Sequence, residues 1–261
     1  WFEGHPNFDK SQWKYYLDEA PQEPEVELQL QKIRADYANM KPEDIKVIDP
    51  CMGSGHILVY AFDVLMQIYE AYGYTAREAV RSIVENNIYG LDIDDRAAQL
   101  AYFSVMMKAR QYDRRFLTRK DEDDNPDVPQ PHVHAIVESN DIDVFSLDYF
   151  VNGDSELKAS MESIIKEMRD AKEYGSILNV TPVDFTKLYT RFDEVRGDIS
   201  ISREIILNDI LPLVEVAEVL SQQYDAVVTN PPYLSNKGMN STLSGYLGKH
   251  FPRTKYDMYS V

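Results

Sequence analysis

Apolar positions along the chain follow two different spacings, and together these predict an α/β fold. Short apolar runs predict four buried strands, at residues 45–48, 87–93, 133–137 and 224–229. Longer stretches with apolar residues at helical spacing follow the first two runs, at residues 55–72, 75–85 and 95–110. Because strands that alternate with helices form parallel sheets, we predict a Rossmann-like sheet with flanking helices.

The same pattern divides the chain into four segments. Residues 1–41 form an N-terminal segment of irregular and helical character, and residues 42–150 carry the first three strands. Residues 151–220 are mostly helical and interrupt the alternation, so we predict a helical insert there. Residues 221–261 carry the fourth strand and the segment after it. A sheet of this kind normally has more strands, and we expect the domain to be incomplete on its C-terminal side.

A glycine turn joins the first predicted strand to a helix start. Residues 49–55 read Asp-Pro-Cys-Met-Gly-Ser-Gly. Gly53 and Gly55 let the backbone approach a ligand, and the helix amino terminus offers free N–H groups. The third glycine of the dinucleotide fingerprint is absent, which argues against NAD. Asp49, followed by Pro50, suits a ligand with a positive ammonium group, such as S-adenosylmethionine.

Acidic residues follow the next two predicted strands. Asp92 ends the second strand, and a carboxylate can accept hydrogen bonds from both hydroxyls of a ribose. Ile93 is placed to pack against an adenine ring. Asp141 follows the third strand, where an acid can accept a hydrogen bond from the adenine amine. An ordinary acidic loop after a strand is the alternative interpretation, and it stays open for Asp92 taken alone.

The motif Asn-Pro-Pro-Tyr, residues 230–233, follows the fourth predicted strand. Pro231 and Pro232 fix the backbone and remove two N–H donors. The amide oxygen of Asn230 and the carbonyl of Pro231 can accept both hydrogens of a planar amine. This favours a pyramidal nitrogen whose lone pair attacks a methylsulfonium carbon in line. Tyr233 supplies an aromatic face for a base turned out of a helix, whereas a simple turn is the alternative interpretation.

The two motifs together resemble the amino-methyltransferases with a class I methyltransferase fold. The flanking residues 46–60 and 89–110 are similar to large bacterial adenine methyltransferases. These include stand-alone restriction–modification enzymes and the PglX type of BREX phage-defence systems. The resemblance covers about residues 42–233.

This resemblance implies a site-specific DNA adenine methyltransferase that moves a methyl group from S-adenosylmethionine to the exocyclic amine of a flipped adenine. It assigns contacts with the methionine end to Asp49, Gly53 and Gly55, with the ribose to Asp92, and with the adenine amine to Asp141. The chain departs from the family at His56, where Phe is frequent.

The net charge bears on DNA binding, and the numbers of cysteine and histidine residues bear on metal binding. The formal net charge is −17, whereas DNA affinity comes mostly from Lys and Arg that neutralise phosphates. We therefore expect a missing C-terminal recognition domain to bind double-stranded DNA, with other defence-system subunits as possible partners. Cys51 is the only cysteine, and the pair His132 and His134 has no third ligand, so we predict no metal site. No apolar stretch reaches the roughly 18 residues of a membrane span, and we expect a bacterial cytoplasmic protein.

Two other functions stay open. A protein glutamine methyltransferase also acts on a planar amide and also carries Asn-Pro-Pro-Tyr. The insert at residues 151–220 and the flanks of the two motifs argue against it. A non-catalytic scaffold that binds the cofactor could lose Asn230 and Tyr233 freely, yet both residues are present.

Overall fold

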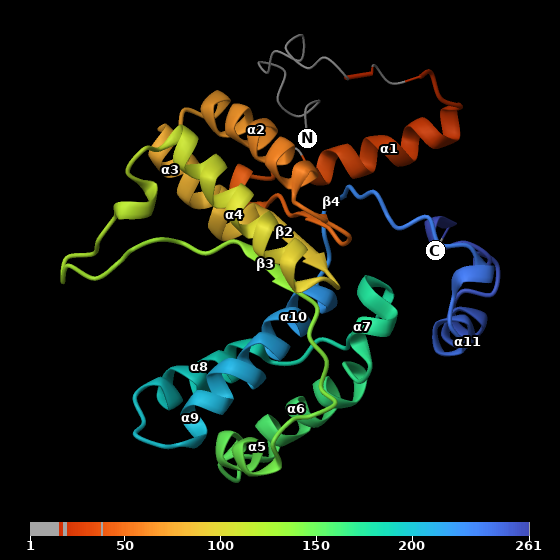
Figure 1. Cartoon of the computed structure of the whole chain (residues 1–261). Coiled ribbons are helices and arrows are strands. Elements are labelled where there is room, and N and C mark those ends of the chain that lie inside the picture. Colours follow the sequence, from red (N-terminus) through yellow and green to blue (C-terminus); the bar gives the residue numbers. More distant parts are fainter. Residues whose placement is uncertain (1–15, 18–19, 38, 261) are drawn as a thin grey trace.

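The sheet has the predicted parallel arrangement. The computed structural model describes residues 16–17, 20–37 and 39–260, so predictions for the other N-terminal positions lie outside it. In this part of the chain one parallel sheet has the strand order β3-β2-β1-β4. Its strands are β1 (Val47–Asp49), β2 (Ile88–Asp92), β3 (His132–Ala135) and β4 (Ala226–Val227). The predicted Rossmann-like α/β fold is confirmed (Figure 1).

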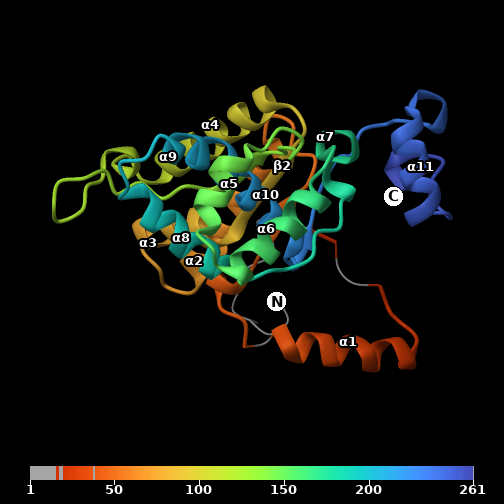
Figure 2. The same ribbon diagram turned by 90° about the horizontal axis from the view of Figure 1, so that it is seen from below.

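Helices cover both faces of this sheet (Figures 1 and 2). One face is covered by α2 (His56–Ala71), α3 (Ala76–Ser82) and α4 (Asp95–Tyr112). The other face is covered by α10 (Leu211–Ser221), with α5 (Val144–Val151), α6 (Ser155–Glu167) and α8 (Phe185–Arg196) in the same core. The remaining α-helices are α1 (Pro24–Tyr37), α7 (Ala171–Tyr174), α9 (Ser202–Ile205) and α11 (Ser241–His250). None of the helices in the described ranges is long and apolar enough to cross a membrane.

Side chains of β2 alternate between the two layers of helices. Ile88 is buried among residues of α2, α3 and α4, whereas Tyr89 and Leu91 are buried in the core that α10 shares with the sheet. A parallel sheet buried on both faces has this pattern because its strands contribute apolar residues to both sides. The segment predicted as a helical insert, residues 151–220, therefore also forms the layer that covers one face of the sheet.

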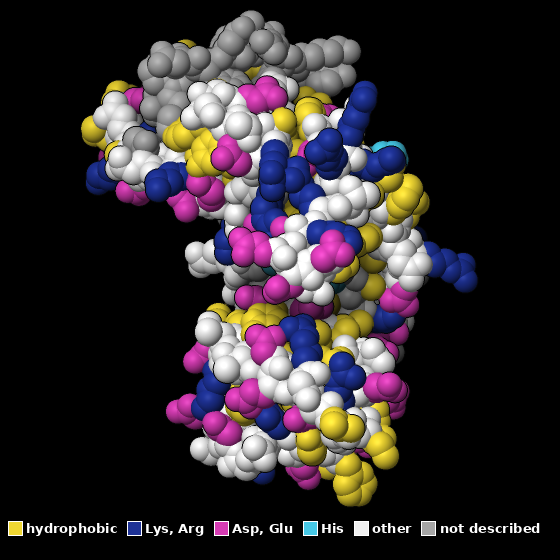
Figure 3. Space-filling model, turned by 90° about the vertical axis from the view of Figure 1, so that its left-hand side faces the viewer, with side chains coloured by type: hydrophobic (Ala, Val, Ile, Leu, Met, Phe, Trp, Pro, Cys, Tyr) yellow, Lys and Arg dark blue, Asp and Glu magenta, His cyan; other side chains and the backbone are white. Residues whose placement is uncertain are grey.

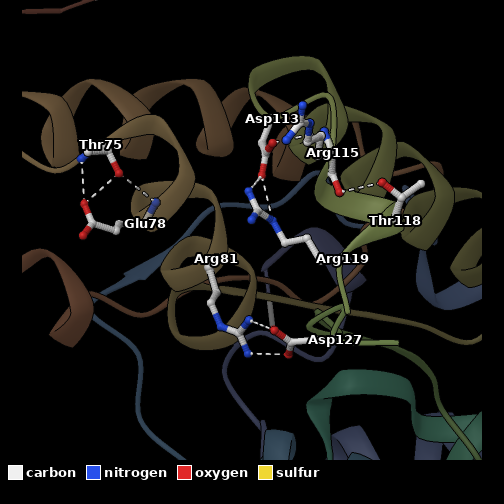
Figure 4. Close-up of polar contacts among 8 residues, drawn as sticks. All are labelled: Thr75, Glu78, Arg81, Asp113, Arg115, Thr118, Arg119 and Asp127. Carbon is white, nitrogen blue, oxygen red and sulfur yellow. Dashed lines mark hydrogen bonds and ion pairs between the residues drawn. The ribbon is translucent and has the colours of Figure 1, made fainter. Parts of the chain in front are cut away.

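Polar contacts fix the start of α3 and the long loop after α4 (Figure 4). Thr75 accepts a hydrogen bond from the backbone N–H of Glu78 and forms a capping box with it. Residues 113–131, the long loop between α4 and β3, are anchored at several points. Phe116 is buried, and Arg81 forms a two-pronged ion pair with Asp127, 2.7 and 3.0 Å long.

The face that carries this loop has mixed charge. Lys and Arg side chains gather in the upper half of the view in Figure 3, and Asp and Glu side chains lie among them. Lys108 contacts Asp63 at 2.6 Å, and Arg119 pairs with Asp113. These ion pairs partly neutralise the cations, so the face is not a uniformly basic surface for a phosphate backbone.

The start of α2 lies unusually close to α4. Gly55 precedes α2 with φ +82°, and a Cβ atom there would lie 3.0 Å from both the Cα and the Cβ of buried Ala101. Glycine therefore satisfies two requirements at once, a left-handed backbone and a close approach of two helices.

We expect Gly55→Ala to lower the free energy of unfolding by about 2 kcal/mol or more. The left-handed backbone costs an alanine about 1–2 kcal/mol, and the overlap with Ala101 adds to this cost. Gly53→Ala is the matched control, because Gly53 also has positive φ (+52°) but its Cβ would meet nothing within 4 Å. Urea unfolding should show the larger loss for Gly55→Ala; equal losses would mean that α4 moves aside without cost.

Candidate active site

Asp49 lies at the carboxyl end of β1 and joins two segments that are far apart in the sequence. Its side chain is 1% exposed. One carboxylate oxygen, Oδ1, accepts a hydrogen bond from the Thr229 hydroxyl at 2.7 Å and another from the Cys51 backbone N–H at 3.1 Å. The carboxylate therefore holds the glycine turn and the segment after β4 at the same edge of the sheet.

The electrostatics of this edge favour a positively charged ligand. Burial raises the pKa of Asp49 above its usual range, and the nearby charge of Asp92 raises it further. The hydrogen bonds from Thr229 and Cys51 oppose this rise without cancelling it. Two neighbouring carboxylates in a partly buried place attract a cation, which would relieve their mutual repulsion.

Asp92 fixes the shape of the glycine turn. Its Oδ2 accepts a hydrogen bond from the Gly53 backbone N–H at 2.8 Å, and its Oδ1 accepts one from the Asp94 backbone N–H at 2.9 Å. Below the turn, Gly90 of β2 makes room for it, because a Cβ there would lie 2.5 Å from Met52 Sδ. The turn is thus held by the protein itself, from the side of β2.

The loop after β3 runs beside Asp92. The backbone N–H of Ile136 donates to the carbonyl oxygen of Asp92 at 2.7 Å. Further along this loop Asp141 is exposed, and Ile93 on the neighbouring loop is 52% exposed. Ile93 directly follows β2 at the edge that carries Asp49. The predicted contacts of Ile93 with the adenine ring and of Asp141 with the adenine amine stay predictions.

The Asn-Pro-Pro-Tyr motif continues directly from β4. The Val228 backbone N–H donates to the Ile48 carbonyl oxygen at 3.0 Å and extends the pairing with β1 towards the motif. Asn230 is exposed, and its Oδ1 accepts a hydrogen bond from the Tyr233 hydroxyl at 3.2 Å. Tyr233 is 80% exposed, while Pro231 is half-buried. Pro232 is exposed.

The histidines lie in different surroundings. His132 stacks on Tyr89 with ring centroids 4.5 Å apart. Burial lowers the pKa of His134 to about 4, so this ring is neutral at pH 7. His56, the first residue of α2, is exposed. Within the described ranges no three His, Cys, Asp or Glu residues are grouped to hold a metal ion.

Comparison with known sequences decides the family. Residues 86–261 match the sequence profile of the family described as Eco57I restriction-modification methylase. This chain belongs to that family.

Curated relatives of this Eco57I-family chain include two long proteins. It is 38% identical over 281 residues to the adenine-specific methyltransferase BrxX of Escherichia coli O9:H4 (strain HS), a match that covers 100% of the chain and 23% of BrxX. It is 35% identical over 255 residues to the adenine-specific methyltransferase PglX of Lacticaseibacillus casei (strain Zhang), covering 95% of the chain and 20% of PglX. The chain thus spans less than a quarter of the length of either relative.

Two contributors to the Eco57I-family site were missed from the sequence. Thr229 directly precedes the Asn-Pro-Pro-Tyr motif, and its hydroxyl at the end of a strand could have indicated a partner for a buried acid. Gly90 interrupts an otherwise bulky buried strand, and a glycine there often marks a close approach of backbone or side chains. Its contact with Met52 is such an approach.

In this Eco57I-family chain we expect Asp49→Asn to keep or raise the free energy of unfolding at pH 7. The amide oxygen can still accept the bond from Thr229, and the cost of burying a charge disappears. Because the native pKa of Asp49 is raised, lowering the pH protonates the folded wild type first and stabilises it. The advantage of the variant should therefore shrink on acidification. Denaturant unfolding over a pH series measures this, and a large loss for Asp49→Asn at pH 7 would contradict it.

Proposed function

We propose that the protein carrying this chain is an adenine-specific DNA methyltransferase. It transfers a methyl group from S-adenosylmethionine to the exocyclic amine of an adenine turned out of double-stranded DNA. The observation that carries the proposal is the bond between Thr229 and Asp49, which brings the amine-holding motif next to the acidic cofactor edge. The family and the names of BrxX and PglX support the same activity.

The residues at the sheet edge fit S-adenosylmethionine. This molecule carries positive charge at its sulfonium and ammonium groups, which matches the paired carboxylates of Asp49 and Asp92. Asp92 holds the ribose hydroxyls, and Ile93 packs on the adenine. The turn through Gly53 and Gly55 accommodates the methionine end, and Asp141 accepts from the adenine amine. When bound, the cofactor supplies the electrophilic methyl group.

The chemistry required of the chain is positioning. Asn230 Oδ1 and the Pro231 carbonyl accept the two hydrogens of the target amine and direct its lone pair at the methyl carbon. The hydrogen bond from Tyr233 uses one of the two lone pairs of the Asn230 oxygen. The Tyr233 ring offers a stacking surface because it is largely exposed. No nucleophilic side chain takes part.

Contact with double-stranded DNA falls to other parts of the full-length protein. The chain has a net charge of −17, and ion pairs such as Lys108–Asp63 occupy part of its cations. A basic recognition domain elsewhere supplies the phosphate contacts and reads the sequence. The setting is a restriction–modification or phage-defence system in the bacterial cytoplasm, with other defence subunits as partners.

Calorimetric titration of the full-length protein should show saturable binding of S-adenosylmethionine. Asp92→Ala should weaken the affinity at least tenfold, which corresponds to about 1.4 kcal/mol. The matched control is Asp94→Ala, which removes a nearby carboxylate that caps α4 by accepting from the Arg96 N–H at 2.7 Å. This control should lower stability by about 1 kcal/mol and leave the affinity unchanged. Equal affinities of wild type and Asp92→Ala would refute the assigned role of Asp92.

Asn230→Ala should bind S-adenosylmethionine as the wild type does and lose at least a hundredfold in the rate of methyl transfer. The substitution removes an acceptor that acts only on the target amine. Transfer of labelled methyl groups to DNA measures the rate. A release-factor protein in the same assay serves as the competing substrate for the alternative activity, glutamine methylation. Labelled protein and unlabelled DNA would establish glutamine methylation instead, and full activity of Asn230→Ala would exclude the mechanism.

A further inference from the structure

A short segment between α6 and α8 borders the proposed cofactor site. We call residues 170–177, which contain α7 and the turn after it, the strap. Ser176 Oγ lies 3.7 Å from Cys51 Sγ in the glycine turn. Gly175 has φ +62°, and a Cβ on it would lie 3.4 Å from Ile93 Cγ2. The strap therefore reaches the segments that follow both β1 and β2.

Polar contacts fix the strap to two further places at this edge. Asn140, in the loop after β3, donates from Nδ2 to Asp170 Oδ1, and the Asp170 backbone N–H donates to Asn140 Oδ1, both at 3.0 Å. Lys172 Nζ lies 3.2 Å from both carboxylate oxygens of Asp95, at the start of α4. Both contacts are exposed, so each is weak by itself. Ala171 of α7 is also fully buried in the core on this face of the sheet, which fixes the helix more firmly.

On its other side the strap contacts α11. The rings of Tyr174 and Tyr246 have centroids 4.5 Å apart, and the Tyr246 hydroxyl donates to the Ile177 carbonyl at 3.4 Å. Asn240, which caps α11, also donates to Glu173. Figures 1 and 2 both show α7 between the sheet and α11. Because α11 comes shortly after the Asn-Pro-Pro-Tyr motif, the strap links two neighbourhoods of the site.

We propose that the strap couples occupancy of the cofactor site to the position of α11 and of the loop that holds the target amine. This inference rests on the proposed function. A ligand that packs on Ile93 and the glycine turn changes the surroundings of Gly175 and Ser176, and the Tyr174–Tyr246 contact carries the change to α11. Tyr174 is a positioning residue in this scheme, because it acts through Tyr246. The coupling is reciprocal, so ordering α11 also favours cofactor binding.

Hydrogen exchange of the α11 amides in the full-length protein tests the coupling, with and without saturating S-adenosylmethionine. We expect the cofactor to slow exchange in α11 at least threefold in the wild type, although no residue of α11 is assigned to the cofactor. Tyr174→Ala should bind the cofactor saturably and show no such slowing. Tyr174→Phe should behave as the wild type, since it keeps the ring. Tyr246→Ala breaks the same contact from the side of α11 and should behave as Tyr174→Ala.

Tyr112→Ala is the matched control. It removes another ring contact, with Phe62 at 6.0 Å, from the far end of α4, and should leave the slowing intact. Saturable binding without slowing in α11 would overturn the inference and leave the proposed function standing. The absence of any saturable binding would overturn both. Slowing that persists in both Tyr174→Ala and Tyr246→Ala would overturn the role of the strap.

Discussion

The buried carboxylate of Asp49 is the constraint on which the site depends. A charge taken out of water destabilises the fold unless it is hydrogen-bonded, and the chain supplies a hydroxyl from Thr229 and a backbone N–H from Cys51. These donors come from segments that are far apart in the sequence, so the hydrogen bonds that stabilise the buried acid also hold the two parts of the site together. The remaining unfavourable electrostatics, seen in the raised pKa, is what a cationic ligand would relieve.

The parallel sheet places Asp49 at the edge where the helices of the site begin. Parallel strands β1, β2 and β3 direct their carboxyl ends to one edge, and the helices α2 and α4 begin there. The turn after β1 fits because Gly55 allows α2 to approach α4 and Gly90 leaves room for Met52. Packing requirements and site geometry are therefore met by the same glycines, which leaves few substitutions that alter one without the other.

The fold followed from residue spacing more fully than the site did. Buried strands and amphipathic helices leave periodic traces, and all four predicted strands form. The boundaries differ for physical reasons. β4 is limited to Ala226–Val227, and the start predicted for β2 fails at Asn87. That side chain is buried and donates to the carbonyls of Pro42 and Ile45, both at 2.7 Å, which no periodicity reveals.

Motif residues were easier to find than their supports. Residues in the glycine turn, Asp92 and the Asn-Pro-Pro-Tyr motif carry recognisable local chemistry, and the structure brings them to one edge. The sequence of the strap contains no motif that marks it as part of the site. Its proposed role rests on contacts with residues far away in the sequence, such as the contact of Ser176 with Cys51. Long-range neighbours of this kind are visible only once the chain is folded.

Asp92 has a consequence for ligand choice. An ionised carboxylate offers about four acceptor positions. The backbone N–H groups of Gly53 and Asp94 occupy two of them. The remaining acceptor positions are enough for the two hydroxyls of a ribose. A deoxyribose has only one of these hydroxyls and would leave an acceptor without its partner. Under the proposed function, the carboxylate thus favours a ribose over the deoxyribose of the enzyme's own polymeric substrate.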